Sequence, residues 1–403
     1  MHDVRGCTVE ALRLSPPPVW TRQLPRVTVG SGRRNDHSTS RVEAIHPVTA
    51  RRRERMVTLA EVARHAGVSA STVSYVLSGK RPISAVTRRR VRASIEQLGY
   101  QPHAGARALA SSRSRIIALM VPLRTDMYVP VMLEIAVAVA TTARAHGYDV
   151  LLLTGEEGPS ALRRVTGSGL AEAVILMDVQ LDDGRLPVLR TAGPPAVLVG
   201  LPADPAGLNC VDLDFRAAGA LCVDHLAGLG HREIAVIGES PGVYARHTGF
   251  AERTLSGLRS RAAEREVRML HRPCEGGHDA VAAVLARILD ERPHVSAFVV
   301  QNETAVEPLL ALLRRTGRAV PEDVSVVAVC ADQIAAQASV PLTSVAIPAQ
   351  ELGRRAVERL IARLTARLTG RPDGEGAAGV ELLTPVLTVR DSSGPPPPRT
   401  PGT

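Results

Sequence analysis

The chain has 403 residues, of which 45% are hydrophobic and 22% are charged, and its formal net charge is +9. This length allows two or three domains with sizeable cores, and the composition is that of a globular protein rather than a disordered or fibrous one. No apolar run approaches the roughly 20 residues of a transmembrane helix, and the N-terminus lacks the apolar segment of a signal peptide. We therefore expect a soluble cytoplasmic protein with no membrane partner.

The positive charge is concentrated near the N-terminus. Residues 56–115 contain ten Lys or Arg but only two acidic residues, and residues 1–55 contain eleven Arg and five acidic residues. The rest of the chain is therefore mildly acidic. A basic end on an acidic body indicates phosphate binding that is confined to that end, since a merely solvated charged face would not concentrate charge in one place.

Residues 1–55 show neither helical nor strand periodicity, because proline, glycine and arginine runs interrupt any pattern. We predict a disordered extension here and a disordered tail at residues 393–403. Met56 stands directly before the first folded pattern. The extension is therefore either the product of a misassigned gene start or a basic arm that adds non-specific DNA affinity.

Residues 57–81 carry the pattern of a helix-turn-helix, whose second helix enters the major groove of DNA. Thr58 and Glu61 have the spacing of a capping box, and Gly67 suits the left-handed end of a helix. Ser69 is placed to cap the second helix. An ordinary helical hairpin is the alternative, and it does not explain the basic surroundings. The expected inward side chains are Val73, Val76 and Leu77, and the expected outward ones are Ala70, Ser71, Ser74 and Tyr75.

A third helix is predicted from Ser84 to about Leu98, ending at Gly99. Its expected inward side chains are Val86, Val91, Ile95 and Leu98. Residues 56–102 thus form a helix-turn-helix DNA-binding domain. The Ala-rich residues 103–110 are either a short hinge helix that forms only when docked, since it is too short to be stable alone, or a plain linker. We assign residues 103–114 to hinge and linker.

From residue 115 to residue 392, buried strands alternate with helices, which is typical of a doubly wound α/β core. We expect two parallel sheets with a crevice at the carboxyl ends of their strands. The N-lobe is predicted to comprise residues 115–210 and 348–366, and the C-lobe residues 211–345 and 378–392. The expected strands are 116–121, 150–153, 173–177, 196–199, 234–237, 297–300 and 324–329.

The chain resembles the LacI/GalR (lactose-repressor/galactose-repressor) family of bacterial transcription regulators over residues 57 to about 390. The resemblance is carried by VTLAEVARHAGVSASTVSYVLSG, TRRRVRASIEQLGYQPHAGARALA, RHTGF and PEDVSVVAV…VPLTSVAIPAQELGRRAVERL. It implies an all-α helix-turn-helix headpiece with a hinge helix, followed by a two-lobed α/β core similar to periplasmic binding proteins. It also implies a dimer on a palindromic operator, whose affinity a small molecule in the core changes.

By this resemblance, Ala70, Ser71 and Tyr75 would read bases, and Ser69, Thr72 and Ser74 would meet phosphates. Tyr75 stands where many members have arginine, so a bidentate guanine contact is not available from it. In the hinge, Leu109 would wedge into the minor groove and kink the duplex. The remaining expected DNA contacts are Thr58, His103, Ala106 and Arg107.

In the core, Arg246 falls at the family's ligand-anchoring arginine, and its fork could clamp hydroxyls, a carboxylate or a phosphate. Glu303 falls where the family usually has an aspartate that accepts from a ligand hydroxyl. Weaker lining candidates are Asp126, Tyr128, Tyr244 and Phe250. The alternatives are an interdomain salt bridge for Arg246 and core packing for the aromatic rings. The altered acidic positions and the scarcity of aromatic residues weaken an assignment to a simple sugar, the family default.

The chain shows no catalytic constellation, and its five cysteines lack metal-site spacing, so we predict no enzyme activity, no metal and no cofactor. The expected function is that of a ligand-responsive regulator on the nucleoid that acts as a repressor. The Pro-rich tail favours a homodimer over a tetramer. A solute-binding protein is the first alternative, which the DNA headpiece and the lack of an export signal oppose. An enzyme on the same fold is the second.

Overall fold

The computed structural model describes residues 57–78, 81–100, 114–124, 128–155, 158–191, 193–369 and 379–398. The predicted disordered extension at residues 1–55 lies outside this part of the chain. The same is true of five residues predicted to contact DNA or ligand: His103, Ala106, Arg107, Leu109 and Asp126. None of the helices in the described ranges has the length and apolarity needed to span a bilayer.

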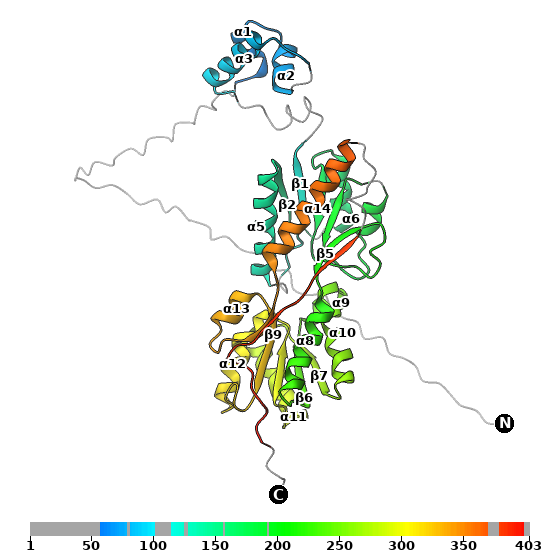
Figure 1. The fold of residues 1–403 in the computed structure, drawn as a ribbon, viewed down its shortest axis with the longest axis vertical. Coiled ribbons are helices and arrows are strands. Elements are labelled where there is room, and N and C mark those ends of the chain that lie inside the picture. Colours follow the sequence, from blue (N-terminus) through cyan, green and yellow to red (C-terminus); the bar gives the residue numbers. More distant parts are fainter. Residues whose placement is uncertain are drawn as a thin grey trace, which may run out of the picture. The chain divides into compact units, whose positions relative to one another are not determined.

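The headpiece consists of the three predicted helices, α1 (Leu59–Ala66), α2 (Ala70–Ser78) and α3 (Ala85–Leu98) (Figure 1). Their shared core is small and apolar, because each helix contributes only a few buried side chains from its inner face. The buried side chains of this headpiece core are Val62, Ala63, Ala66, Val73, Val91 and Tyr100.

Local hydrogen bonds fix the ends of the headpiece helices as predicted. Thr58 Oγ1 accepts from the N–H of Glu61 (3.3 Å), and Glu61 Oε2 accepts from the N–H of Thr58 (2.7 Å), which completes the capping box. Gly67 ends α1 with a φ of 61°. Ser69 Oγ then accepts from the N–H of Thr72 (3.2 Å) and begins α2.

Two apolar residues of the headpiece do not face inward, so their predicted orientation was wrong. Leu77, in the last turn of α2, is 38% exposed, and Val86, in the first turn of α3, is 67% exposed. Val86 lies about 140° around α3 from the buried Val91, given 100° per residue. Both residues sit at a helix end, where the neighbouring helices do not cover them.

The N-lobe is built on a parallel sheet with the strand order β11-β5-β4-β3-β1-β2. Helices α5 (Val129–Ala145) and α14 (Ala349–Thr369) cover one face of this sheet, and α6 (Gly158–Gly167) and α7 (Leu186–Arg190) cover the other (Figure 1). The strands are β1 (Ile116–Met120), β2 (Asp149–Leu153), β3 (Ala173–Leu176), β4 (Ala196–Val199), β5 (Asn209–Leu213) and β11 (Val380–Leu383).

The C-lobe sheet has the order β12-β10-β9-β8-β6-β7, and only its edge strand β12 runs antiparallel to its neighbour. Its strands are β6 (Glu233–Gly238), β7 (Arg268–Pro273), β8 (Ala297–Val300), β9 (Ser325–Cys330), β10 (Thr343–Ala346) and β12 (Leu387–Thr388). Its helices are α8 (Phe215–Gly228), α9 (Pro241–Ala245), α10 (Gly249–Glu264), α11 (Gly277–Glu291), the 3-10 helix η1 (Glu303–Ala305), α12 (Val306–Arg315) and α13 (Asp332–Gln337). Two doubly wound lobes were predicted, and the architecture is confirmed.

The limits of the two lobes differ from the prediction. Strand β5 crosses the predicted boundary after residue 210, and β11 lies in the segment 378–392 that was assigned to the C-lobe, yet β11 pairs in parallel with β5 in the N-lobe sheet. The chain therefore passes between the lobes three times, after β5, after β10 and after β11. Only the last crossing, into β12, returns it to the C-lobe.

The segment that follows β12 is bound to the C-lobe up to at least Gly394, so the tail predicted as disordered from residue 393 was misplaced. The N–H of Gly394 donates to Ser325 Oγ (3.0 Å), and its carbonyl lies 3.0 Å from His231 Nε2. Ser393 Oγ lies 2.8 Å from His225 Nε2. These polar partners come from distant parts of the chain. They hold in place a segment whose composition alone does not suggest an ordered structure.

Helices α8 and α10 approach each other unusually closely at two glycines. A Cβ on Gly219 would lie 2.3 Å from the carbonyl oxygen of Thr254, and a Cβ on Gly257 would lie 1.9 Å from that of Arg216. No side chain fits at such distances, so the two backbones can approach this closely only at glycines. This contact sets the separation of two helices whose first turns reach the cavity described below.

Candidate functional site

The second helix of the headpiece presents a polar surface that could meet DNA. The residues predicted to contact DNA on and before this helix are either exposed or partly exposed. Exposed are Thr58, Ser69, Ala70 and Ser71, and partly exposed are Thr72, Ser74 and Tyr75. Small residues on this face leave room for the helix to approach base edges closely.

Hydroxyl groups at the start of α2 are linked to each other. Ser69 Oγ lies 2.8 Å from both Ser71 Oγ and Thr72 Oγ1. Together with the N–H groups of the first turn, they form a cluster of donors that suits phosphate oxygens. That Ser69 and Thr72 meet phosphates stays a prediction.

One of the basic residues counted in residues 56–115, Arg81, lies next to the predicted reading face. The guanidinium carbon of Arg81 is 5.3 Å from the centroid of the Tyr75 ring, in a cation–π arrangement. Arg81 therefore supplies a guanidinium beside the ring of Tyr75. Its contact with Tyr75 was not predicted, because Arg81 follows the end of α2 and helical spacing does not place it.

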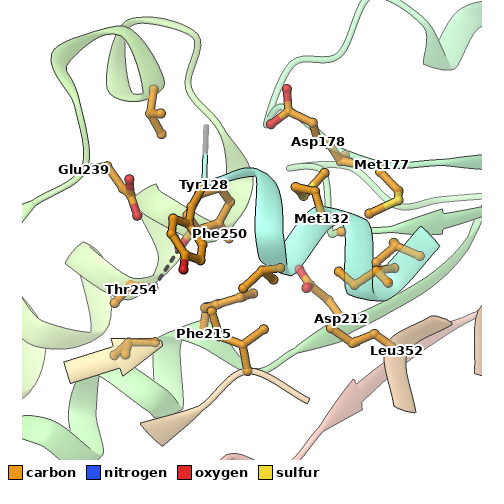
Figure 2. Close-up of a pocket in the computed structure, with 18 of the residues that line it drawn as sticks. Tyr128, Met132, Met177, Asp178, Asp212, Phe215, Glu239, Phe250, Thr254 and Leu352 are labelled. Carbon is orange, nitrogen blue, oxygen red and sulfur yellow. Dashed lines mark hydrogen bonds between the residues drawn. The ribbon is translucent and has the colours of Figure 1, made fainter. Parts of the chain in front are cut away.

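A cavity of about 120 Å³ in the core is lined by residues of both lobes (Figure 2). Because the walls belong to both lobes, a molecule in the cavity contacts both. The N-lobe contributes Tyr128, Met132, Met177, Asp178 and Asp212, among others, and the C-lobe contributes Phe215, Glu239, Phe250, Gln301 and Glu303, among others.

Three aromatic rings line this cavity, although the chain has few of them. Tyr128 precedes α5, Phe215 is the first residue of α8, and Phe250 is the second residue of α10. The ring centroids of Phe215 and Phe250 are 5.6 Å apart with an interplanar angle of 50°. The close approach of α8 and α10 therefore also positions this ring pair. Rings of this kind suit apolar, sugar or cationic ligands.

Four carboxylates line the same cavity, at the carboxyl ends of strands or just after them. Asp178 follows β3 and forms an ion pair with Arg124. Glu303 begins η1, and its Oε1 accepts from the N–H of Ala331 (2.7 Å). Burial raises the pKa of Glu303 to about 7. Glu239, directly after β6, is the third.

Asp212 is the fourth carboxylate and the most buried of the group, with 3% exposure. Its Oδ1 accepts from the N–H of Leu213 (3.0 Å). Burial is the largest cause that raises its pKa to about 7, opposed by backbone hydrogen bonds from Leu213 and Leu201 and by the charge of Arg253. The carboxyl group is therefore poised between its neutral and charged forms near neutral pH.

This shift predicts how stability depends on pH. The unfolded chain ionises Asp212 near pH 4, but the folded chain keeps the proton to about pH 7, so burial of this group destabilises the fold increasingly as pH rises between these values. Compared with Asp212→Asn, the wild type should lose about 2 to 3 kcal/mol of unfolding free energy between pH 5 and pH 8. Urea denaturation of both proteins at the two pH values measures this difference. A difference between the proteins that does not change with pH would contradict the prediction.

Two other residues predicted to contact the ligand, Arg246 and Tyr244, do not line the cavity. Arg246 follows α9, its Nε and Nη2 atoms are buried, and it is not among the residues that line the cavity. Tyr244 lies behind the wall: its hydroxyl donates to Gln301 Oε1 (2.8 Å) and accepts from the N–H of Glu239 (3.3 Å). It thus holds one lining side chain and one lining segment in place. Ligand contact by Arg246 stays a prediction.

Sequence reasoning did not select several of the lining residues, although a signal was available. Glu239 and Gln301 directly follow β6 and β8, and Asp212 lies near the end of β5. Polar residues at the carboxyl ends of parallel strands mark the crevice in doubly wound folds. Phe215 had no such signal, because α8 was not among the predicted helices.

Profile comparisons identify both parts of the chain. Residues 58–103 match bacterial regulatory proteins of the lacI family, and residues 223–393 match a periplasmic binding protein-like domain. The HTH-type transcriptional regulator CelR of Thermobifida fusca is 31% identical over 319 residues, which cover 76% of this chain and 92% of CelR. The HTH-type transcriptional repressor PurR of Aliivibrio fischeri is 27% identical over 322 residues, with 76% and 91% covered.

Solved structures agree with this relationship. A transcriptional regulator CelR–cellobiose complex is 29% identical with a TM-score of 0.57, over 83% of this chain and 99% of the other. The lac repressor dimer bound to operator and the anti-inducer ONPF has a TM-score of 0.71 at 24% identity, over 84% and 100%, which is a likeness of fold. The chain therefore belongs to the LacI family of bacterial regulatory proteins and is a DNA-binding transcriptional regulator.

Proposed function

We propose that this protein is a ligand-responsive repressor that binds a palindromic operator as a homodimer and takes a small molecule into the cavity between its lobes. One observation carries the proposal: a single chain combines a helix-turn-helix with an exposed polar face and a cavity lined from two lobes. A molecule that contacts both lobes favours one arrangement of them, and an arrangement that presents the headpieces differently changes operator affinity.

The surface of α5 supports the homodimer. Val129, Leu133 and Val137 follow one another at four-residue spacing and are 43%, 57% and 57% exposed. Leu152, on the edge strand β2 of the same lobe, is 48% exposed. Exposed apolar side chains gathered in this way indicate a protein interface. We infer that a second copy covers this face, and that two headpieces then reach half-sites about one helical turn apart.

A carbohydrate is the default effector, since the relative CelR has been solved with cellobiose. The proposal treats the cavity as a binding site rather than an active site. It also places the protein in the cytoplasm, on the nucleoid, where operator DNA is found.

The test is to map the DNA that the protein retains from fragmented genomic DNA of its host. We expect one enriched inverted repeat. Its affinity should fall steeply with salt, by about 10³-fold or more between 50 and 200 mM, because the exposed arginines of the headpiece release counterions. Scrambled DNA of equal length is the control. Failure to enrich an inverted repeat, or a flat salt response, would contradict operator binding, and conversion of a bound compound to a product would favour the enzyme alternative.

A further inference from the structure

We propose that the cavity takes a small aromatic molecule with at most one polar group, and not the sugar that is the default effector. The inference rests on the proposed function and deepens it, because it takes this cavity to be the effector site and names the chemical class of its ligand.

The first support is the apolar character of the cavity wall. Most of the residues that line the cavity have aliphatic, methionine or aromatic side chains, and they come from both lobes (Figure 2). The aliphatic ones include Val131, Ile135, Val199, Val243, Val329 and Ile347. A ligand gains free energy when such a wall removes its carbon surface from water, whereas each hydroxyl that it buries without a partner costs free energy. The wall therefore favours a ligand with a mainly hydrocarbon surface.

The second support comes from amide and hydroxyl groups of the wall, which already bind protein partners. Gln301 Oε1 accepts from the hydroxyl of Tyr244 (2.8 Å), and its Nε2 donates to the carbonyl of Ala251 (3.2 Å). Thr254 Oγ1 donates to the carbonyl of Phe250 (2.8 Å) (Figure 2). A group that the protein already satisfies gains little from a ligand hydroxyl. Gln301 and Thr254 therefore offer little to a sugar.

Carboxylates of the wall are engaged in the same way. Asp178 forms an ion pair with Arg124. Asp212 and Glu303 each accept from a backbone N–H. Arg246, whose fork was predicted to clamp ligand hydroxyls, does not line the cavity. A sugar that entered would lose its hydrogen bonds to water and would find few protein groups to replace them.

The third support is the size of the cavity and the presence of rings in its wall. An apolar cavity of about 150 Å³ in another protein holds one benzene molecule, so a volume of about 120 Å³ suits a single ring better than a disaccharide. Phe215 and Phe250 are tilted by 50° to each other, and Tyr128 lines the cavity from the N-lobe. Rings in such positions can make edge-to-face or offset contacts with an aromatic ligand, which a saturated ring cannot make.

The experiment measures the affinity of the full chain for matched ligands by isothermal titration calorimetry. Cyclohexanol and myo-inositol share one carbon ring and differ in the number of hydroxyl groups, so cyclohexanol should bind at least about tenfold more tightly. The molecules p-cresol and 4-methylcyclohexanol differ in aromaticity, so p-cresol should bind at least about threefold more tightly. Glucose, as the sugar, should bind more weakly than p-cresol by at least about tenfold.

Two variants test whether the binding occurs in this cavity. Phe250→Leu removes a partly exposed ring from the wall and keeps an apolar side chain, and it should weaken p-cresol binding at least about fivefold. Tyr148→Leu removes a partly exposed ring that does not line the cavity, and it should change the affinity less than about twofold. Thermal denaturation shows whether both variants are folded, and the ligand series on the wild type decides the ligand class in either case.

Four outcomes would overturn the inference: myo-inositol or glucose binding as tightly as p-cresol, equal binding of p-cresol and 4-methylcyclohexanol, unchanged p-cresol affinity in folded Phe250→Leu, or no p-cresol binding up to about 10 mM. The proposed function fails separately, if the protein enriches no inverted repeat from genomic DNA. If the operator is bound and only sugars change that binding, the proposed function stands and the aromatic inference alone is wrong.

Discussion

Replacement of Val73 with asparagine is expected to abolish operator binding while the core remains folded. Val73 is fully buried in α2, within the small core of the headpiece. A buried amide without partners costs about 3 kcal/mol, and a headpiece of this size has little stability to spare. An unfolded headpiece cannot present α2 to DNA, so operator affinity should fall at least about 100-fold. Fluorescence anisotropy measures the affinity, and calorimetry follows the core.

The same substitution at Val86 provides the control. Val86 is 67% exposed on α3, so an asparagine there stays hydrated, and operator affinity should change less than about threefold. The two variants together distinguish the effect of disrupting the headpiece core from the effect of replacing any valine of the headpiece. Equal losses in both variants would mean that Val73 is not essential to the headpiece core.

Replacement of Gly257 with alanine is expected to be the most damaging single-methyl change in the core. The added Cβ would meet the carbonyl oxygen of Arg216 at 1.9 Å, so α8 and α10 must separate. Overpacking of backbone against backbone should cost about 3 kcal/mol or more, which lowers the melting temperature by about 6 °C. The rings of Phe215 and Phe250 lie in the first turns of these helices, so ligand affinity should fall as well.

Gly228→Ala is the matched control for that prediction. Gly228 is the exposed last residue of α8, and a Cβ there would meet no atom within 4 Å. Alanine is the better helix former by up to about 1 kcal/mol, so this variant should be unchanged or slightly more stable. Similar melting temperatures for the two variants would show that α8 and α10 can separate without cost.

A strand of this fold can be predicted from the sequence where its apolar residues form an uninterrupted run. Strands such as β1 and β8 are buried on both faces and consist of uninterrupted apolar residues, so they are visible as runs. Strand β5 contains Asn209 and Asp212, and β12 has only two residues, so neither forms a run. The boundary between the lobes was misplaced for the same reason, because it depends on β5 and β11.

The residue pattern also fails to predict the burial or order of a segment when the residues that contact it are distant in the chain. Leu77 and Val86 are apolar, but which apolar residues of a helix are covered depends on neighbours that periodicity does not specify. The segment around Gly394 has the composition of a tail, and it is held by His231 and Ser325, which are at least 69 residues away in sequence. Long-range polar contacts of this kind leave no local signal.

In the candidate site, too, some residues could be predicted from the sequence and others could not. Tyr128, Phe250 and Glu303 were selected by resemblance to a family, and they line the cavity. Asp212 and Phe215 were not, because they flank the first crossing between the lobes, which the predicted boundary placed within a single lobe. Both residues are buried at the wall of the cavity, and only a three-dimensional structure reveals this burial.

The interleaving of the two lobes also determines the order in which the protein can acquire its properties during synthesis. The headpiece is complete at Tyr100, whereas the N-lobe sheet lacks its edge strand until Leu383 has been added, and the C-lobe lacks bonds from its last segment until Gly394. Because domains fold in order as the ribosome releases them, the headpiece can fold before the cavity is complete. A chain that stops early would keep a folded headpiece without a complete cavity.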